Sequence, residues 1–216
     1  MDEAAVKAQV LAHIRRASRR RPIIVTAELT LGRSCVRADL AVLADGDLIG
    51  LEIKTERDTL RRLSAQLNGY ARFFDRAVVI AARCHLNAMK DLDLRGASLW
   101  TFDHNGIEVV SVGHQNPIAP LAHIELMTRD EKKGVSMISA MTVREHYFEV
   151  FARRYGQTSA AFWRSVSGRP IKPSDVKLLS RFTERREAIF AIAREKAEHW
   201  QRWSEAYANA AVGCPA

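Results

Sequence analysis

Hydrophobic positions follow two different spacings in the first third of the chain. Residues 3–19 place apolar side chains every three or four positions, which is the spacing of a helix with one buried face. Residues 23–31, 36–44 and 48–54 are instead rich in β-branched side chains or alternate between apolar and polar. The pattern therefore predicts one helix followed by three strands.

The same reasoning extends the prediction to residue 112. Asp45-Gly46 separates the second and third strands, and this dipeptide is a strong signal for a tight hairpin. A helix is expected from Asp58 to Asp75, with Asp58 as its N-cap. The apolar run at 76–82 predicts a buried strand, and strands are expected at 97–102 and 107–112.

This order of elements predicts an α/β protein with an αβββαβ core and a mixed central sheet. Residues 114–120 contain two prolines and are typical of a linker. Beyond it the spacing favours helices at 121–132, 142–155, 157–166 and 174–208. Two parts are therefore expected: a core at 1–115 and a C-terminal α-helical region at 116–216.

The hairpin register places two carboxylates together. With a two-residue loop, Leu43 faces Leu48, and continuing along the strands sets Asp39 opposite Glu52. Directly paired side chains lie about 4.5–5.5 Å apart at Cβ, and two like charges at that separation destabilise a sheet unless a positive charge lies between them. A divalent cation is the obvious candidate.

The period of two along a strand brings a lysine to the same surface. Glu52 and Lys54 share one face, whereas Leu51 and Ile53 point the other way. Oxygen ligands suit Mg²⁺, which can polarise a phosphoryl oxygen and help to generate hydroxide. A neighbouring lysine can orient the water or stabilise developing negative charge. The pattern therefore indicates hydrolysis of a phosphodiester bond.

Three further residues are candidates for this site. Glu28, on the strand before, could supply another acid. Gln66 and Tyr70 are four residues apart and share a helix face, where they could hold the lysine, a water or a phosphate. Simpler readings stay open: Glu52 and Lys54 as a solvated ion pair, Glu28 as an exposed strand residue, and Tyr70 as part of the core.

At these positions the sequence resembles the PD-(D/E)XK, or restriction-endonuclease-like, nuclease superfamily. Its signature is an Asp on one strand and Glu-x-Lys on the next, matched by Asp39 and by Glu52 to Lys54. The Q-x-x-x-Y motif of RecB-type nucleases is matched by Gln66 and Tyr70. The sequence is also similar to an uncharacterised bacterial family within that superfamily. Ala38 stands where the name-giving proline would be.

The resemblance implies a restriction-endonuclease-like core, a Mg²⁺ or Mn²⁺ cofactor and cleavage of DNA. It implies Asp39 and Glu52 as metal ligands, the Ile53 carbonyl as a further ligand, and Lys54 as the catalytic lysine. It covers residues 1–112, with its specific part at 28–70.

Charge strengthens the expectation of a nucleic-acid partner. The chain has a formal net charge of +8, and residues 1–22 hold six Lys or Arg against two acids, a net charge of +4. Residues 23–123 hold eleven Lys or Arg against twelve acids, a net charge of −1. A basic arm beside a neutral core can attract a polyanion. The arginines expected to contact nucleic acid are Arg15, Arg16, Arg19, Arg20, Arg37 and Arg62.

Cysteine spacing and hydropathy indicate where the protein acts, and other partners and functions stay open. The three cysteines are far apart and form no CxxC pair, which favours a reducing cytoplasm. No run of residues is apolar enough to suggest a membrane span. A homo-oligomer or a protein partner bound through the C-terminal helices is also compatible with the sequence. The alternative function is a catalytically inactive nucleic-acid-binding or adaptor module that keeps the nuclease fold.

Overall fold

The computed structural model describes residues 1–18, 21–34, 36–133, 135, 140–180 and 199–201. Residues 1–180 form one compact unit, and the architecture below is that of this unit. Its first elements are α1 (Glu3–Ala17), β1 (Ile24–Thr30), β2 (Arg37–Ala44), β3 (Asp47–Lys54), α2 (Leu63–Phe73) and β4 (Arg76–Ala82). They confirm the predicted order of a helix, three strands, a helix and a strand.

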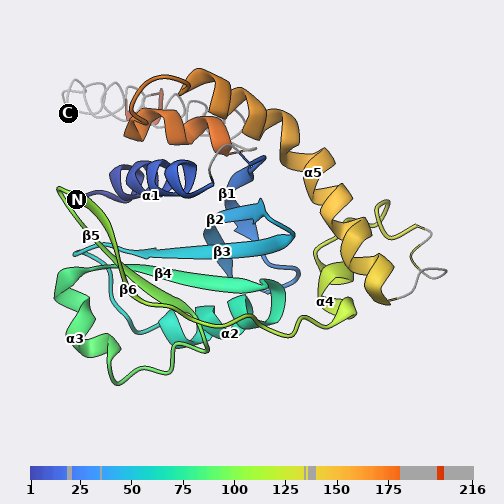
Figure 1. The fold of residues 1–216 in the computed structure, drawn as a ribbon, viewed down its shortest axis with the longest axis horizontal. Helices are drawn as coiled ribbons and strands as arrows, with labels where there is room; N and C mark the ends of the chain where they lie inside the picture. Colours follow the sequence, from blue (N-terminus) through green and yellow to red (C-terminus); the bar gives the residue numbers. More distant parts are fainter. Residues whose placement is uncertain (19–20, 35, 134, 136–139, 181–198, 202–216) are drawn as a thin grey trace, which may run out of the picture. The chain divides into compact units, whose positions relative to one another are not determined.

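Six strands form one mixed sheet, in which β5 (Ser98–Asp103) and β6 (Gly106–Ser111) follow β4 (Figure 1). The strands lie in chain order from β1 to β6. The pairs β1–β2, β2–β3 and β5–β6 are antiparallel, whereas β3–β4 and β4–β5 are parallel. The expected mixed α/β class is therefore confirmed.

Helices cover both faces of this sheet. α1 packs Val6, Val10 and Leu11 against one face, where Leu51 and Ile53 of β3 are also buried. α2 packs on the opposite face, where Gly50 has no side chain and leaves room for the ring of Phe74. Because side chains alternate along β3, Glu52 and Lys54 point to the α2 side of the sheet.

The region after the sheet is helical, as expected, but its elements differ in detail. It contains α4 (Pro120–Glu125), the long helix α5 (Ala140–Ser165) and the 3₁₀ helix η3 (Pro173–Leu179). α5 is one continuous helix through Gly156, where the sequence predicted a break. It passes beside β1 and packs against that strand (Figure 1). The predicted helix at 174–208 falls largely outside the described residues.

The start of α2 was predicted wrongly. The helix begins at Leu63, five residues after Asp58. The Asp58 carboxylate instead accepts hydrogen bonds from the main-chain N–H of Thr55, at 2.8 Å, and from its hydroxyl, at 2.6 Å. It therefore closes a turn after β3 and caps no helix.

Two short elements between β4 and β5 were not predicted. They are the 3₁₀ turn η1 (Arg83–His85) and the one-turn helix α3 (Leu86–Met89). Their apolar side chains are too few to show a helical period. Across the described part of the chain, no helix combines the length and the apolar character needed to cross a bilayer.

Candidate active site

The predicted hairpin register is present, and the pairing of β2 with β3 ends next to the predicted site residues. Leu43 pairs with Leu48 and Leu40 pairs with Leu51, in the register that the Asp45-Gly46 loop requires. Beyond the Leu40–Leu51 pair, a side chain takes the place of a main-chain carbonyl as acceptor. Oδ2 of Asp39 accepts a hydrogen bond from the Ile53 N–H at 2.7 Å. This hydrogen bond holds Asp39, near the start of β2, next to Ile53, near the end of β3.

Glu52 is held by three donors. Its Oε1 accepts hydrogen bonds from Lys54 Nζ at 2.7 Å and from Gln66 Nε2 at 2.6 Å. Its Oε2 accepts one from the Tyr70 hydroxyl at 2.7 Å. Lys54 Nζ also donates to Gln66 Oε1 at 2.9 Å, so strand β3 and helix α2 are joined by a closed polar network.

Three of these four polar or charged residues are buried, and Gln66 is half-buried. Glu52 is 2% exposed, Lys54 6% and Tyr70 fully buried. A buried carboxylate is tolerated when it is paired and hydrogen-bonded, and here all of the donors come from predicted site residues. The simpler reading of Glu52 and Lys54 as a solvated surface pair does not describe this geometry.

Asp39 carries the clearest electrostatic signal of the site. Burial, followed by the nearby negative charge of Glu52, raises the pKa of Asp39 to about 7. The Ile53 N–H and the positive charge of Lys7 act in the opposite direction and do not cancel it. A carboxylate crowded in this way gains free energy from binding either a proton or a cation.

A hollow of about 650 Å³ opens over these groups. Glu52, Lys54 and Gln66 of the network belong to its lining. Thirteen residues line it: Glu3, Thr30, Ser34, Val36, Arg37, Asp39, Glu52, Ile53, Lys54, Asp58, Arg62, Ala65 and Gln66.

The donor set fits a hydrated Mg²⁺ better than a fully enclosed ion. Within the described ranges, no three His, Cys, Asp or Glu side chains gather in a metal-binding arrangement. Mg²⁺ usually keeps several waters and is held by one or two carboxylates together with substrate phosphate. Asp39, Glu52 and the Ile53 carbonyl could supply a set of that size, and burial followed by the charge of Glu52 raises the pKa of Asp39.

Comparison with known proteins places the chain in a family. A family model described as bacteriophage P4 protein cII matches residues 1–180. The chain belongs to the bacteriophage P4 protein cII family. The matched residues include the whole sheet and the hollow with Asp39 and Glu52.

Two other comparisons give no information on activity. No curated protein shows a significant match to this member of the P4 cII family. Among solved structures, the SPO1766 protein of unknown function from Silicibacter pomeroyi is similar, with a TM-score of 0.47 and 18% sequence identity. That alignment covers 76% of this chain and 92% of the other.

Glu28 does not line the hollow of this P4 cII family protein, and neither does the fully buried Tyr70. Glu28 lies in β1 with a left-handed φ of 60°, and the β1–β2 pairing omits it between Ala27 and Leu29. Its carboxylate lies 3.9 Å from the guanidinium of Arg37.

The predicted nucleic-acid arginines fall into three groups. Arg37 and Arg62 line the hollow beside Asp39. Arg15 and Arg16 lie at the far end of α1 and line other hollows. Arg19 and Arg20 lie outside the described residues.

Sequence reasoning missed the contribution of helix α1. Glu3 lines the hollow, and its carboxylate forms an ion pair with Lys7 Nζ at 2.5 Å. Lys7 is 6% exposed and its charge acts on Asp39. The available signal was the four-residue spacing of a Glu and a Lys on a predicted helix, next to the apolar positions that face the sheet.

Proposed function

We propose that this protein is a metal-dependent nuclease that hydrolyses DNA phosphodiester bonds with Mg²⁺ or Mn²⁺. The core would be of the restriction-endonuclease-like, PD-(D/E)XK type. The observation that carries the proposal is the convergence of Asp39, Glu52 and Lys54 on one accessible hollow, with the Gln66 amide bridging the acid and the lysine.

The arrangement of elements supports the superfamily assignment. The order αβββαβ is the one implied by the motif resemblance, and Asp39 and Glu52 lie on the two strands of the hairpin. Gln66 and Tyr70 come from the helix that follows and both bind Glu52. A chance match of the motif would give no reason for these four side chains to lie close together.

A divalent cation would be held by Asp39 and Glu52, with the Ile53 carbonyl as a further oxygen. When bound, it would polarise a phosphoryl oxygen and lower the pKa of a coordinated water. The remaining chemistry belongs to the side chains. The Ile53 N–H fixes the direction of the Asp39 carboxylate, and the Tyr70 hydroxyl and the Gln66 amide fix that of Glu52.

Lys54 would act on the reacting phosphate. Its ammonium group lies at the hollow and is held by Glu52 and Gln66 rather than left to move in solvent. A positive charge fixed before the reaction stabilises the negative charge that develops on the phosphoryl oxygens. Lys54 would also orient the attacking water through one of its three protons.

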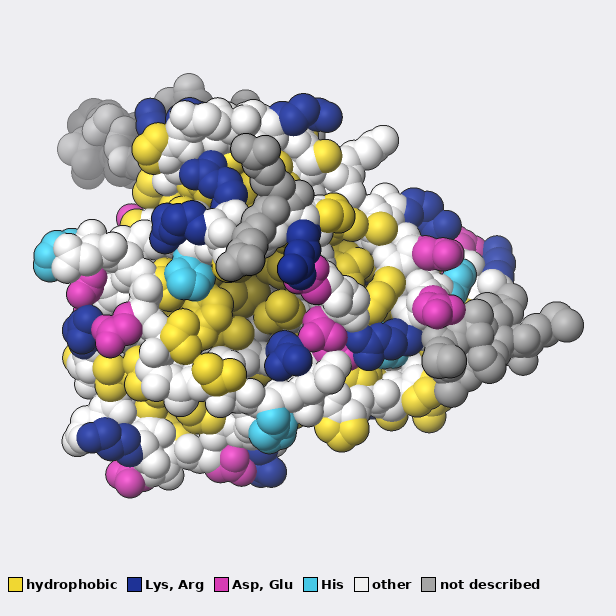
Figure 2. Space-filling model, viewed as in Figure 1, with side chains coloured by type: hydrophobic (Ala, Val, Ile, Leu, Met, Phe, Trp, Pro, Cys, Tyr) yellow, Lys and Arg dark blue, Asp and Glu magenta, His cyan; other side chains and the backbone are white. Residues whose placement is uncertain are grey.

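Basic groups around the hollow support a nucleic-acid substrate. Arg37 and Arg62 line it, and their side chains can neutralise backbone phosphates on either side of the cleaved bond. The face drawn in Figure 2 carries Lys and Arg side chains, interspersed with Asp and Glu, around a central group of hydrophobic side chains. Binding of this kind weakens as salt concentration rises.

The decisive experiment is a cleavage assay with single- and double-stranded DNA in Mg²⁺ or Mn²⁺. Wild type is expected to cut, and Lys54→Met to cut at least about a hundredfold more slowly, since positioned acid–base and electrostatic groups contribute factors of that size. Lys90→Met removes an exposed lysine outside the hollow and serves as the matched control. Intact DNA with wild type, or equal cutting by the Lys54 variant, would sink the proposal.

A second function, an inactive nucleic-acid-binding module, is favoured by one specific observation. Both oxygens of Glu52 already accept hydrogen bonds from donors of the chain, and the residue is 2% exposed. In an inactive module this network would serve simply to join β3 to α2. The module would retain DNA on a filter in a salt-dependent manner and leave it uncut with either metal, with equal retention by wild type and Lys54→Met.

A further inference from the structure

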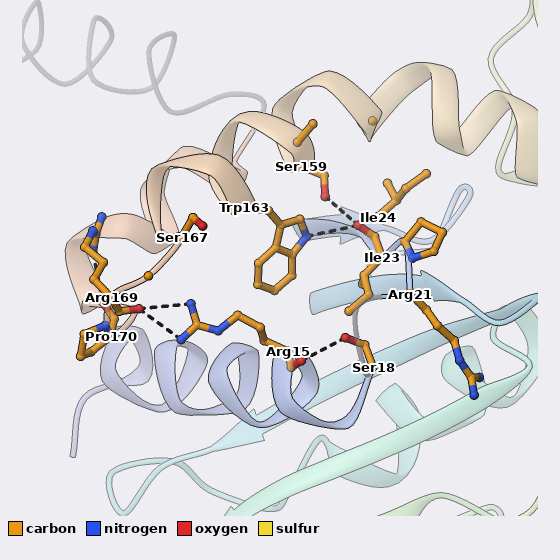
Figure 3. Close-up of a pocket in the computed structure, with 14 residues that line it drawn as sticks. Arg15, Ser18, Arg21, Ile23, Ile24, Ser159, Trp163, Ser167, Arg169 and Pro170 are labelled. Carbon is orange, nitrogen blue, oxygen red and sulfur yellow. Dashed lines mark hydrogen bonds between the residues drawn. The ribbon is translucent and has the colours of Figure 1, made fainter.

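A second and larger hollow lies at the opposite end of helix α1 from the candidate active site. Its volume is about 810 Å³, within the usual range of about 300–1,000 Å³ for small-ligand sites. It is bounded by the end of α1, the start of β1, helix α5 and the loop after it (Figure 3). The fourteen lining residues are Arg15, Ser18, Arg21, Pro22, Ile23, Ile24, Gly156, Ser159, Ala160, Trp163, Ser167, Gly168, Arg169 and Pro170.

The lining is positively charged without compensation from its own residues. It contains three arginines and no Asp or Glu. Two of the arginines are balanced from outside it: Arg21 pairs with Asp45 at 2.8 Å, and Arg169 pairs with Asp175 at 2.7 Å. In Figure 3 the side chain of Arg21 extends away from the hollow.

Arg15 is different, because only neutral oxygens hold it. Its guanidinium donates to the carbonyl of Val166 at 2.9 Å and twice to the carbonyl of Arg169 at 3.2 Å. Among the described residues, no carboxylate lies within ion-pair distance of Arg15. The fold therefore fixes a half-buried cation at the wall of the hollow and leaves its charge unneutralised.

A fixed aromatic ring faces the same space. Trp163 reaches from α5 toward α1, and its Nε1–H donates to the carbonyl of Ile23 at 3.2 Å (Figure 3). The ring packs edge-on against Phe162, with centroids 4.9 Å apart, and it remains only half-buried. Its orientation is thus set before any ligand arrives.

We propose that this hollow binds a nucleotide, with the base against Trp163 and the phosphate on Arg15. A planar ring and a fixed guanidinium on facing walls match the two chemical parts of a nucleotide. Arginine binds phosphate through several donors at once, and stacking on an aromatic side chain accepts any base. The hydroxyls of Ser18 and Ser167 lie within the lining and can serve the sugar or the phosphate.

The inference does not depend on the proposed nuclease activity. Glu3, at the start of α1, lines the acidic hollow, and Arg15 lies twelve residues further along the helix. At about 1.5 Å per residue the two sites are roughly 18 Å apart. The ligand is either a free nucleotide or one nucleotide of a strand, and the two sources differ only in what is attached to the phosphate.

The test is calorimetric titration in EDTA, so that binding at the acidic hollow through a metal is removed. The probes are dAMP, deoxyadenosine, inorganic phosphate and a short 5′-phosphorylated oligodeoxyadenylate. Wild type is expected to bind dAMP more tightly than either deoxyadenosine or phosphate alone. Tighter binding of the oligonucleotide than of dAMP identifies a strand as the source, and equal binding identifies a free nucleotide.

Variants assign the binding to the hollow. Arg15→Gln is expected to weaken dAMP binding roughly ten- to hundredfold, the loss of a charge-assisted contact. Trp163→Leu is expected to weaken it about tenfold while leaving phosphate binding unchanged. Arg164→Gln removes an exposed charge from α5 outside the lining and is the matched control.

A further variant covers the case in which Arg15→Gln fails to fold. Ser167→Asp adds a carboxylate to the exposed rim of the hollow without touching the contacts of Arg15, and it should weaken dAMP binding by a similar factor. Ser174→Asp, exposed and outside the lining, is its control. Failure of wild type to bind dAMP or the oligonucleotide, or equal binding by Ser167→Asp, overturns the proposal.

Discussion

The hydroxyl of Tyr70 donates a hydrogen bond to Oε2 of Glu52 at 2.7 Å, and neither residue is more than 2% exposed. The contact joins helix α2 to strand β3 beneath the hollow. Burial, together with the negative charges of Glu52 and Asp39, raises the pKa of Tyr70 well above its usual value. The phenol therefore stays protonated and remains a donor to the carboxylate.

Replacing Tyr70 with Phe should destabilise the protein by about 1–3 kcal/mol. The change leaves Oε2 of a buried carboxylate without a donor, and the cost of desolvating an unpaired polar group is of that size. The free energy of unfolding in denaturant measures it. Tyr147→Phe is the matched control, because the buried Tyr147 hydroxyl has no hydrogen-bond partner within the described residues.

That control should be neutral or stabilise the protein by about 1 kcal/mol, since it removes a polar atom that gains nothing from being buried. The comparison tests whether the Tyr70 contact matters beyond ring packing. Equal destabilisation by Tyr70→Phe and Tyr147→Phe would show that the hydrogen bond from Tyr70 to Glu52 does not stabilise the protein.

Asp39→Asn should stabilise the metal-free protein at alkaline pH. The pKa of Asp39 is raised from 3.8 to about 7 in the folded state, chiefly by burial and then by Glu52. The folded state therefore binds an extra proton between these values, and stability declines as pH rises through that window. Asn keeps an oxygen for the Ile53 N–H and carries no charge.

The expected gain for Asp39→Asn in EDTA is roughly 2 kcal/mol at about pH 8 and close to zero at about pH 4. Thermal or denaturant unfolding at both pH values measures it. Adding Mg²⁺ at about pH 8 should then stabilise wild type more than the variant, because only wild type retains the Asp39 carboxylate. A variant that is less stable than wild type at both pH values would show that Asp39 is not under electrostatic strain.

Much of the sheet and the centre of the hollow were predictable from short-range rules. The Asp45-Gly46 loop determines the register of β2 and β3, and the period of two then places Glu52 and Lys54 on one face. The period of the helix places Gln66 and Tyr70 together on α2. These rules depend only on residues close in sequence, which is why they held.

What sequence reasoning missed has local causes at Glu28 and Asp58 and a long-range cause at Glu3 and Lys7. Glu28 has a left-handed backbone inside a strand, which alternation cannot reveal. Asp58 binds the Thr55 main chain rather than a helix end, although both uses satisfy the same preference of Asp for free N–H groups. Glu3 and Lys7 act on Asp39 only because α1 packs across the sheet near the start of β2 and the end of β3, and no local pattern encodes that packing.

Two glycines should respond in opposite ways to alanine. A Cβ on Gly50 would lie 2.3 Å from a ring carbon of Phe74, so the ring or the strand must move. Overpacking of this kind typically costs about 1–3 kcal/mol, and Phe74 is fully buried with little room to shift. Gly50→Ala is therefore expected to lower the free energy of unfolding by at least about 2 kcal/mol.

Gly156 lies within α5, and a Cβ there meets nothing within 4 Å. Gly156→Ala should raise stability by about 0.5–1 kcal/mol, the difference in helix propensity. Denaturant unfolding of both variants provides the comparison. A stabilising effect at Gly50, or a loss at Gly156, would be inconsistent with the packing of α5 and Phe74 described above.

His123 should make the protein less stable in mild acid. The side chain is 2% exposed, and neither ring nitrogen has a partner among the described residues. Its ring lies 5.4 Å from that of Tyr147 and 6.1 Å from that of Phe148. Burial, followed by the charge of Arg144, lowers the pKa of His123 from 6.5 to about 4.

The direction of the change in stability with pH depends on whether the folded or the unfolded chain takes up the proton first as pH falls. Between pH 6.5 and about 4 the unfolded chain protonates this histidine and the folded chain does not, so stability falls as pH falls through that window. At 1.36 kcal/mol per pKa unit, the loss is at most roughly 3 kcal/mol. Above the window both states are neutral and His123 contributes no pH dependence.

His123→Leu keeps an apolar side chain of similar size and removes the titration. The free energy of unfolding of the variant should therefore fall by about 2 kcal/mol less than that of wild type between about pH 7 and about pH 4.5. Burial raises the pKa of Asp75, which gives a pH dependence of opposite sign, but Asp75 is common to both proteins and its effect cancels in the difference. Parallel stability curves for wild type and variant would mean that the folded protein protonates His123 as readily as the unfolded chain does, which requires a polar partner or solvent at the ring.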